Sequence, residues 1–139
     1  MSDGAADRVE IADLLMRYAL YFDAHDGERF ADLFTADGSF VRPGGAIVSG
    51  GEELAAMASG APDMQHFPTP AAIDFESDDV ARARSRVIAL RADSTALHMV
   101  TAAEYEDELR RTEAGWRIQQ RRVLVWLPSE LAGLQLGSA

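Results

Sequence analysis

Several residue types and patterns that support common chemistry are missing from this chain of 139 residues. It has no cysteine, so disulfides, thiol nucleophiles and thiolate metal sites are excluded. Its 13 basic residues are outnumbered by 23 acidic ones, and a net charge of −10 repels phosphate backbones, so we expect no nucleic-acid partner. No glycine-rich loop follows a predicted strand, and no apolar run is long enough to span a bilayer. We therefore expect a cytoplasmic protein with no cofactor and no membrane partner.

The composition that remains is typical of an ordered globular protein. Hydrophobic residues make up 47% of the chain and charged residues 26%. The opening residues lack the basic and apolar regions of a signal peptide. A chain of this length can bury one substantial core. The sequence predicts a single domain over residues 1–139, with its core at about residues 8–126 and a tail over 127–139.

The first half of the sequence has the spacing of helices. Apolar residues recur every three or four positions from Asp7 to about Ala24, which predicts a first helix with Asp23 at the margin of its apolar stripe. Asp26 is predicted to cap a second helix that runs through Phe34, and a third helix is predicted over 52–57. Residues 35–38 have the composition of a turn, and 39–42 that of a short strand.

The second half has the pattern of a sheet. Strands are predicted over 71–76, 80–91, 95–109 and 116–127, joined by turns so short that neighbours must be antiparallel. Helices followed by such strands predict an α+β fold, a cone-shaped barrel in which N-terminal helices pack on a strongly curved, mostly antiparallel sheet. Charges alternate on two adjacent strands, and we expect them to face one another on a solvated surface: Arg82, Arg84, Arg86, Glu104, Glu106 and Glu108.

Strand alternation also predicts which side chains share a face. Met99 and Thr101 lie on one face of their strand, and His98 lies on the other. On the last strand, strict alternation puts Arg121 and Trp116 on opposite faces, and Arg121 equally fits a surface residue paired with a glutamate. Both tryptophans are expected in the core. The sequence does not decide which faces line the hollow of the sheet.

Asp23 and His66 are the two residues best suited to chemistry. A carboxylate that holds an imidazole inside an apolar cavity makes a general base or acid. Each residue also has a structural interpretation: His66 fits the junction of a loop and a strand, and Asp23 fits a helix-terminal carboxylate, although the C-terminal end of a helix disfavours an acid. His25, His66 and His98 lack the spacing of a known metal site, so we expect no metal.

Short motifs along the chain resemble those of a known superfamily. They are Ile11-x-x-Leu14-x-x-x-Tyr18-x-x-x-x-Asp23, Leu33-Phe34-Thr35-x-Asp37-Gly38-x-Phe40, Gln65-His66-Phe67, and Tyr105-x-Asp107-x-Leu109 ahead of Gly115-Trp116-Arg117-Ile118-x-x-Arg121. This pattern, which covers about residues 8–126, resembles the SnoaL-like branch of the nuclear transport factor 2-like superfamily. Members include polyketide cyclases, scytalone dehydratase, hexachlorocyclohexane dehydrochlorinase, ketosteroid isomerase and dioxygenase small subunits, so the shared fold does not fix the function.

The resemblance implies roles for particular residues. Asp23 and His66 stand at the positions of the pair that moves the proton in scytalone dehydratase and the dehydrochlorinase. The tyrosine positions of scytalone dehydratase hold Phe22 and Phe40 here, and its second histidine falls near Leu90, which leaves the barer pair of the dehydrochlorinase type. The resemblance also implies that residues of the first helix and last strand reach the pocket. The substrate-binding candidates are Tyr18, Phe22, Phe40, Leu90, Met99, Thr101 and Arg121.

The first functional hypothesis is a cofactor-independent, dehydratase-type lyase that acts on a hydrophobic, oxygenated small molecule. His66 would accept a proton from carbon, Asp23 would fix its tautomer, and Tyr18 or Arg121 would stabilise the developing oxyanion. A ketosteroid-isomerase-like isomerase or a polyketide cyclase is an alternative. A second class is a ligand-binding module or a dioxygenase small-subunit-like assembly module, which needs no Asp–His pair.

The resemblance further implies a homo-oligomer, a dimer or trimer that associates through the outer surface of the sheet. The tail over 128–136 is apolar enough to cover a pocket mouth or to reach a neighbouring subunit. The sequence does not decide between these two roles.

Overall fold

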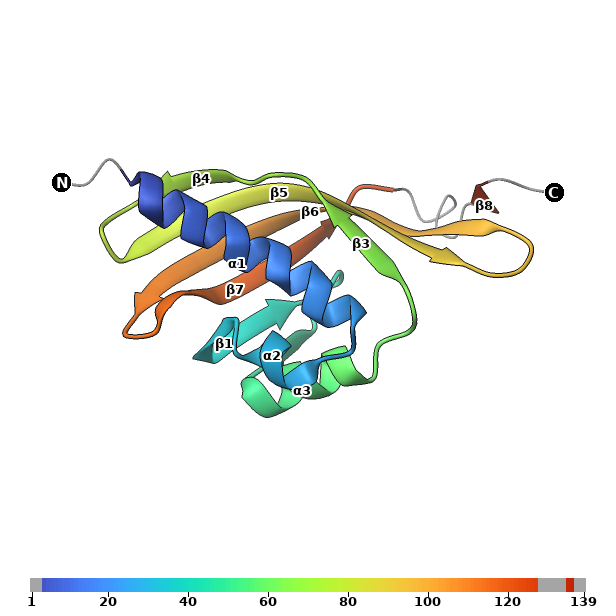
Figure 1. Ribbon diagram of the computed structural model, residues 1–139, viewed down its shortest axis with the longest axis horizontal. Coiled ribbons are helices and arrows are strands. Elements are labelled where there is room, and N and C mark those ends of the chain that lie inside the picture. Colours follow the sequence, from blue (N-terminus) through green and yellow to red (C-terminus); the bar gives the residue numbers. More distant parts are fainter. Residues whose placement is uncertain (1–3, 128–134, 137–139) are drawn as a thin grey trace.

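Helices pack on a mixed, mostly antiparallel sheet in an α+β arrangement, as the sequence predicts (Figure 1). The computed structural model describes residues 4–127 and 135–136, so most of the predicted tail lies outside the described residues. The helices are α1 (Ala5–Asp23), α2 (Gly27–Ala31) and α3 (Gly51–Ser59). The strands are β1 (Phe34–Val41), β2 (Ile47–Ser49), β3 (Gln65–Pro68), β4 (Ala72–Phe75), β5 (Val80–Ala92), β6 (Leu97–Thr112), β7 (Gly115–Val125) and β8 (Gln135–Leu136).

The first helix forms where the sequence predicts it and lies across the sheet (Figure 1). It ends at Asp23, and His25 follows with a left-handed backbone, at a φ of 57°. Asp26 then caps α2 as predicted, because its Oδ1 accepts a hydrogen bond from the Arg29 N–H at 3.1 Å. None of the helices in residues 4–127 is long and apolar enough to cross a membrane. The buried residues of α1 are the predicted stripe, Ile11, Leu14, Leu15, Tyr18 and Ala19.

The second helix is shorter than the sequence predicts. It ends at Ala31, and Phe34 begins β1 instead of continuing the helix. Sheet pairing outweighs the helical spacing here, because the Ile118 N–H donates to the Leu33 carbonyl at 2.9 Å and Phe34 is buried opposite Ile118. The turn predicted over 35–38 is also wrong, since these residues lie inside β1 where its pairing with β7 shifts register.

The sheet follows the order β2-β1-β7-β6-β5-β3, with β4 also paired to β5 and β8 to β6. The hairpins that join β5, β6 and β7 are antiparallel, as predicted. Strand β1 pairs with β7 in parallel, which the sequence does not predict because the two strands come from opposite ends of the chain. Strands β2 and β3 are not predicted either, since three and four residues carry too little alternation.

The predicted register of the charged strands is confirmed. Three arginines of β5, Arg82, Arg84 and Arg86, are exposed and alternate with buried residues, so they lie on the outer face of the sheet. Arg84 donates to both carboxylate oxygens of Glu104 at 3.0 Å. The solvated interpretation of these charges therefore holds. Arg82, Arg84 and Arg86 stand opposite Glu108, Glu106 and Glu104.

A bulge in β7 changes the face on which Arg121 lies. The pairing of β7 with β6 skips Gln119, because Ile118 stands opposite Leu109 while Gln120 stands opposite Glu108. Arg121 therefore shares the inner face with Ile118. The prediction that Arg121 and Trp116 lie on opposite faces of the strand is wrong.

A second bulge, in β6, separates Met99 from Thr101. The pairing with β5 skips Val100, so Thr101 stands opposite Ala89 and Met99 stands opposite Leu90. Because Ala89 and Leu90 are neighbours on a regular strand, they point to opposite faces. The prediction that Met99 and Thr101 share a face is wrong for this reason.

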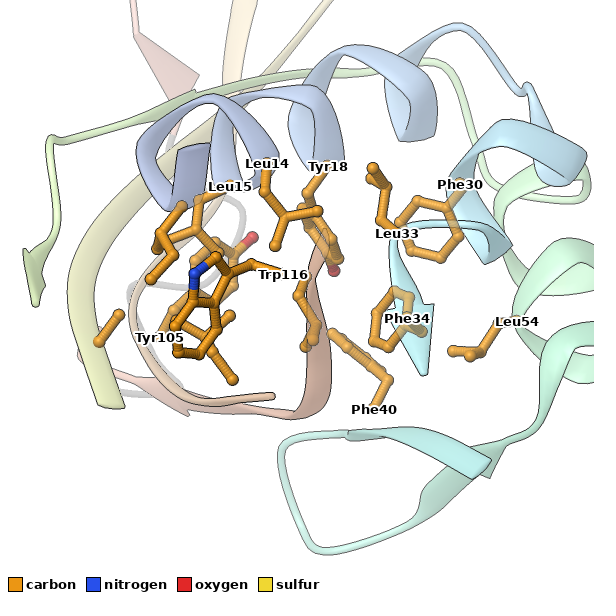
Figure 2. Packing of buried hydrophobic residues seen from close by; sticks show 14 of the residues in the cluster. Leu14, Leu15, Tyr18, Phe30, Leu33, Phe34, Phe40, Leu54, Tyr105 and Trp116 are labelled. Carbon is orange, nitrogen blue, oxygen red and sulfur yellow. The ribbon is translucent and has the colours of Figure 1, made fainter. Parts of the chain in front are cut away.

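The core lies between α1, the inner face of the sheet and the two short helices. Figure 2 shows Tyr18 with Trp116 and Tyr105 to one side and Phe30 and Phe34 to the other. The Tyr18 ring contacts those of Phe30 and Tyr105 at centroid distances of 4.9 and 5.8 Å. Trp116 is buried as predicted.

Trp126 does not join this core, and the prediction that it would is wrong. Trp126 follows β7, and its backbone N–H donates to the Ala102 carbonyl at 2.9 Å. The residue is 77% exposed. Alternation from Val125, which stands opposite the buried Ala103, turns Trp126 to the outer face of the sheet.

Candidate active site

Asp23 and His66 meet where the end of α1 lies against the strand β3, which ends the strand order. Asp23 is the last residue of α1, and His66 is the second residue of β3 rather than part of a loop junction. An edge strand leaves outward N–H groups without a ladder partner. The His66 N–H finds one in Asp23, whose Oδ2 accepts it at 2.7 Å. The Asp23 carboxylate thus holds the backbone of β3 at His66.

The same carboxylate also holds the imidazole ring. Its Oδ1 lies 2.6 Å from Nδ1 of His66. Because an ionised carboxylate only accepts hydrogen bonds, Nδ1 carries the hydrogen, and in the neutral ring Nε2 bears the lone pair. Both oxygens of Asp23 are therefore engaged by one residue. The predicted contact between these two side chains is confirmed; their catalytic role stays a prediction.

The pair is shielded without being sealed. The side chain of His66 is 10% exposed, and that of Asp23 is 16% exposed. Phe22 packs edge to face against the imidazole, with ring centroids 5.3 Å apart. A cleft of about 480 Å³ reaches Asp23. Its apolar walls are Met64, Phe67, Leu90 and Leu97, and its polar groups include Asp63, Gln65 and Arg91.

The sheet register shows which strand candidates share a face with His66. His66 stands opposite Ala89, and Ala89 stands opposite Thr101, so these three side chains form one row across β3, β5 and β6. Ala89 is fully buried and small, which leaves the space between the outer two for other atoms. Leu90 and Met99 lie on the other face, where Leu90 lines the cleft that reaches Asp23. Thr101 therefore shares the face of His66, two strands away, and Leu90 lines the cleft from the opposite face.

The remaining aromatic candidates are part of the packed core. Tyr18 is 3% exposed and Phe40 is 9% exposed. The Tyr18 and Phe22 rings stack with centroids 6.3 Å apart, so Phe22 joins His66 to this core. Phe40 stands opposite Arg121 in the parallel pairing of β1 with β7.

Arg121 lies in a sealed pair with Asp107. Its Nε and Nη2 donate to the two carboxylate oxygens at 2.7 and 2.8 Å. The side chains are 1% and 0% exposed, so the interpretation of Arg121 as a surface residue paired with a glutamate is wrong. The guanidinium lies between two rings, 4.1 Å from the Tyr18 centroid and 3.8 Å from that of Tyr105. A chain of ring contacts thus leads from His66 through Phe22 and Tyr18 to a buried cation.

The protonation states at this buried end are fixed near neutral pH. Burial raises the pKa of Tyr105 to about 12, although the Arg121 cation acts in the opposite direction. Burial likewise raises the pKa of Tyr18 well above its ordinary value. Burial opposes the charge on Arg121, but the carboxylate of Asp107 outweighs it, and the pKa of Arg121 is raised. Both phenols stay protonated and the guanidinium stays charged, so this end holds a fixed positive charge and exchanges no protons near neutral pH.

Sequence reasoning missed Asp107 and Tyr105 as parts of the site. Both belong to the motif Tyr105-x-Asp107-x-Leu109, whose alternation puts them on one face with an apolar residue. A carboxylate on a buried face needs a buried cation. That signal was sufficient to predict a buried partner for Asp107, but the bulge at Gln119 concealed that the partner is Arg121.

Nothing in residues 4–127 and 135–136 forms a group of three or more His, Asp or Glu side chains that could hold a metal ion. The expected absence of a cofactor stays a prediction. The groups that the site offers for chemistry are the imidazole of His66 and the carboxylate of Asp23, and the buried Arg121 cation is a fixed charge behind them.

Comparison with known proteins gives the family. Residues 3–122 match the model of the SnoaL-like domain. The chain belongs to the SnoaL-like family. Comparison with curated proteins gave no significant match. The SnoaL-like assignment thus rests on most of the chain and on the structural likenesses that follow.

Solved structures share the SnoaL-like fold of this chain. An NTF2-like protein with a cystatin-like fold from Novosphingobium aromaticivorans is 29% identical, with 91% of this chain and 86% of that one covered and a TM-score of 0.83. A protein of unknown function from Mycobacterium tuberculosis is 27% identical, with 94% and 81% covered and a TM-score of 0.82. A Novosphingobium aromaticivorans protein proposed to be a scytalone dehydratase is 18% identical, with 100% and 95% covered and a TM-score of 0.79, which is a likeness of fold.

Proposed function

We propose that this SnoaL-like protein is a cofactor-independent lyase of the dehydratase type. Its substrate is a hydrophobic, oxygenated small molecule, His66 moves the proton, and Asp23 orients His66. The observation that carries the proposal is the double attachment of Asp23 to one residue, at 2.6 Å to Nδ1 and 2.7 Å to the backbone N–H. A binding module has no need for an imidazole whose tautomer and orientation are both fixed.

The reaction follows from the state of the ring. Neutral His66 accepts a proton through Nε2 from a carbon next to a carbonyl, and the imidazolium that forms is stabilised by Asp23. The electron pair left on carbon is delocalised into the carbonyl and then expels a hydroxyl group from the adjacent carbon. His66 returns its proton to that hydroxyl, which leaves as water. The limited exposure of the pair strengthens its attraction relative to bulk water.

The buried cation supplies the second requirement, a fixed positive charge behind the site. Arg121 keeps its charge, and Tyr18 and Tyr105 keep their hydroxyl hydrogens, for the reasons of burial given above. In the proposal, the developing charge on a substrate oxygen is stabilised by the field of the Arg121 cation, which packs on the far side of Tyr18. Asp107 holds Arg121 in place at 2.7 and 2.8 Å.

An isomerase or cyclase uses the same pair and differs in where the proton goes. His66 would return the proton to another carbon, or release the enolate for ring closure, without loss of water. Product analysis separates these reactions, because only the lyase forms one molecule of water for each turnover.

The test screens hydroxylated ketones as substrates, follows turnover by the change in absorbance, and compares the wild type with a variant that lacks the imidazole. His66→Ala should lower turnover by about 10²–10⁴-fold, the contribution of a general base. Far-UV circular dichroism should show an unchanged fold. His98→Ala is the matched control, since His98 pairs with Asp93 on the β5–β6 hairpin at 2.7 Å. Unchanged turnover in His66→Ala would remove His66 from the mechanism, and a ligand bound without turnover by the wild type would favour the binding module.

We also propose a homo-oligomer that associates through the outer face of the sheet. A row of apolar residues crosses that face, with Phe67 opposite Ile88, and Ile88 opposite Ala102 beside Trp126. Phe67 is 55%, Ile88 43% and Trp126 77% exposed, and a contiguous row of exposed apolar side chains is typical of an interaction surface. Sedimentation of the wild type and of Trp126→Ser would test it, because a monomeric wild type contradicts the proposal.

A further inference from the structure

His25 lies two residues beyond Asp23 and connects three parts of the fold. Its Nε2 is 2.8 Å from Oδ1 of Asp63, in the segment between α3 and β3. Its Nδ1 is 3.3 Å from the carbonyl oxygen of Ala58, near the end of α3. The residue itself follows α1 with a φ of 57°, a conformation that histidine adopts more readily than most side chains. The imidazole therefore joins α1, α3 and the segment 60–64.

The two partners of the ring determine its charge. Both a carbonyl oxygen and a carboxylate oxygen accept hydrogen bonds, whereas a neutral imidazole has one N–H and one bare nitrogen. Both contacts can be donated at once only by the imidazolium. The pKa of His25 is raised, first by the hydrogen bond to Asp63 and then by that to Ala58. Geometry and electrostatics agree that His25 is a cation in this arrangement.

The other charged groups near His25 are already engaged. Asp23 adds a weaker attraction, and both its oxygens are held by His66. Asp26 accepts the N–H of Arg29 as the cap of α2. From α3, the contact is the Ala58 carbonyl. Asp63 is thus the group whose attraction to the ring depends most directly on the charge of His25.

The segment that His25 holds leads straight into the site. Asp63 is three residues before His66, and Asp63, Met64 and Gln65 line the same cleft as Asp23. We propose that His25 is a positioning residue: its imidazolium braces segment 60–64 against α1 and α3, and so keeps His66 in place against Asp23. Only the expected effect of His25 on turnover rests on the proposed function; its effect on the position of segment 60–64 does not.

The pH dependence has a definite sign. A raised pKa in the folded state means that the brace is fully present below the ordinary pKa of histidine, about 6.5. It is lost as the pH rises through the raised pKa of His25. The neutral ring keeps one of its two contacts, so segment 60–64 loosens without unfolding. The side chain of Asp63 is 99% exposed, so the expected effect is modest.

Hydrogen exchange of the His66 amide measures the brace directly, because that N–H donates to Asp23. The chain has three histidines, so their titrations can be resolved by NMR. In the wild type, protection of the His66 amide should fall by about two- to fivefold as His25 loses its proton, the range for an exposed ion pair. In His25→Asn, which tolerates the left-handed backbone but carries no charge, protection should be low and free of that step. Asp63→Asn should lower the pKa of His25 and weaken protection.

Two further variants separate the brace from other causes. His25→Gly relieves the backbone conformation, so protection that is restored in His25→Gly would mean that the ring is not what holds the segment. His98→Asn removes the other exposed His–Asp pair and should leave the His66 amide unchanged. A pH step that persists in His25→Asn would assign the step to His66 itself and overturn the proposal.

The outcome is independent of the proposed reaction. Loss of turnover in His66→Ala together with a flat exchange profile would keep the base and reject the brace. A brace seen by exchange in a protein whose turnover does not need His66 would do the reverse. If both hold, turnover at saturating substrate should decline with the same pH midpoint as the His66 amide protection.

Discussion

The pair Asp23–His66 lies at the end of α1, and the pair Asp107–Arg121 packs against Tyr18 of the same helix. Both join a carboxylate to nitrogen donors at 2.6–2.8 Å. Their surroundings differ. In the first pair the His66 side chain is 10% exposed and that of Asp23, which borders a cleft, is 16% exposed. In the second pair Arg121 is 1% and Asp107 0% exposed, and Arg121 lies against two tyrosine rings. An imidazole can gain and lose a proton near neutral pH, and a guanidinium cannot. Similar geometry therefore leaves a group that can exchange protons at one end and a fixed charge at the other.

The largest difference between the pairs should be seen in turnover. Asp23→Asn should lower turnover by about 10²–10⁴-fold, because an amide has one oxygen for two donors and gives the imidazolium no countercharge. The fold should survive, since the pair is partly exposed. Steady-state rates and thermal melting of the variant would check this. A variant with wild-type turnover would mean that Asp23 only accepts the backbone hydrogen bond from β3 and has no role in the reaction.

The sealed pair should dominate stability instead. Asp107→Ala should lower the free energy of unfolding by about 3–5 kcal/mol, because it leaves the Arg121 charge buried without a partner. Urea unfolding measures this value. The double variant Asp107→Leu with Arg121→Met should recover much of the loss, since no charge is then buried. If Asp107→Ala is as stable as the wild type, the pair is not sealed in solution.

The smallest expected effect is a pH dependence at the sealed end. The folded pKa of Tyr105 is raised to about 12, so between its ordinary value near 10 and that value the unfolded chain binds fewer protons than the folded one. Stability should therefore fall as the pH rises through this window, by up to about 1.4 kcal/mol per pH unit for one group. Tyr105→Phe should remove that part of the slope, measured by urea unfolding at several alkaline pH values. An identical slope in Tyr105→Phe would show that the hydroxyl is not buried.

Regular features of the sequence predict regular parts of the fold. The stripe of α1 and the alternating charges of β5 and β6 are repeated signals, and each leads to the observed element and register. The contact of Asp23 with His66 is predicted through motif resemblance, because nothing local in either segment indicates the other. The parallel pairing of β1 with β7 has no local signal at all.

Single-residue irregularities limit what the sequence predicts of the site. A bulge moves every later side chain of its strand to the other face, and alternation alone cannot reveal it. The skipped residues Gln119 and Val100 explain why alternation wrongly separates Arg121 from Trp116 and wrongly joins Met99 with Thr101. Phe34 shows a different limit, because its spacing suits a helix while its burial opposite Ile118 favours a strand.

The two tryptophans give the protein a built-in optical reporter. Trp116 is buried, and its indole N–H donates to Asp7 near the start of α1 at 3.0 Å, whereas Trp126 is 77% exposed. In a single subunit, fluorescence from Trp126 should therefore be quenched readily by a dissolved quencher such as acrylamide, and fluorescence from Trp116 should resist it. Replacing Trp126 by Phe would leave an emission signal that follows the docking of α1 on the sheet, which makes rapid-mixing refolding studies possible without any added dye.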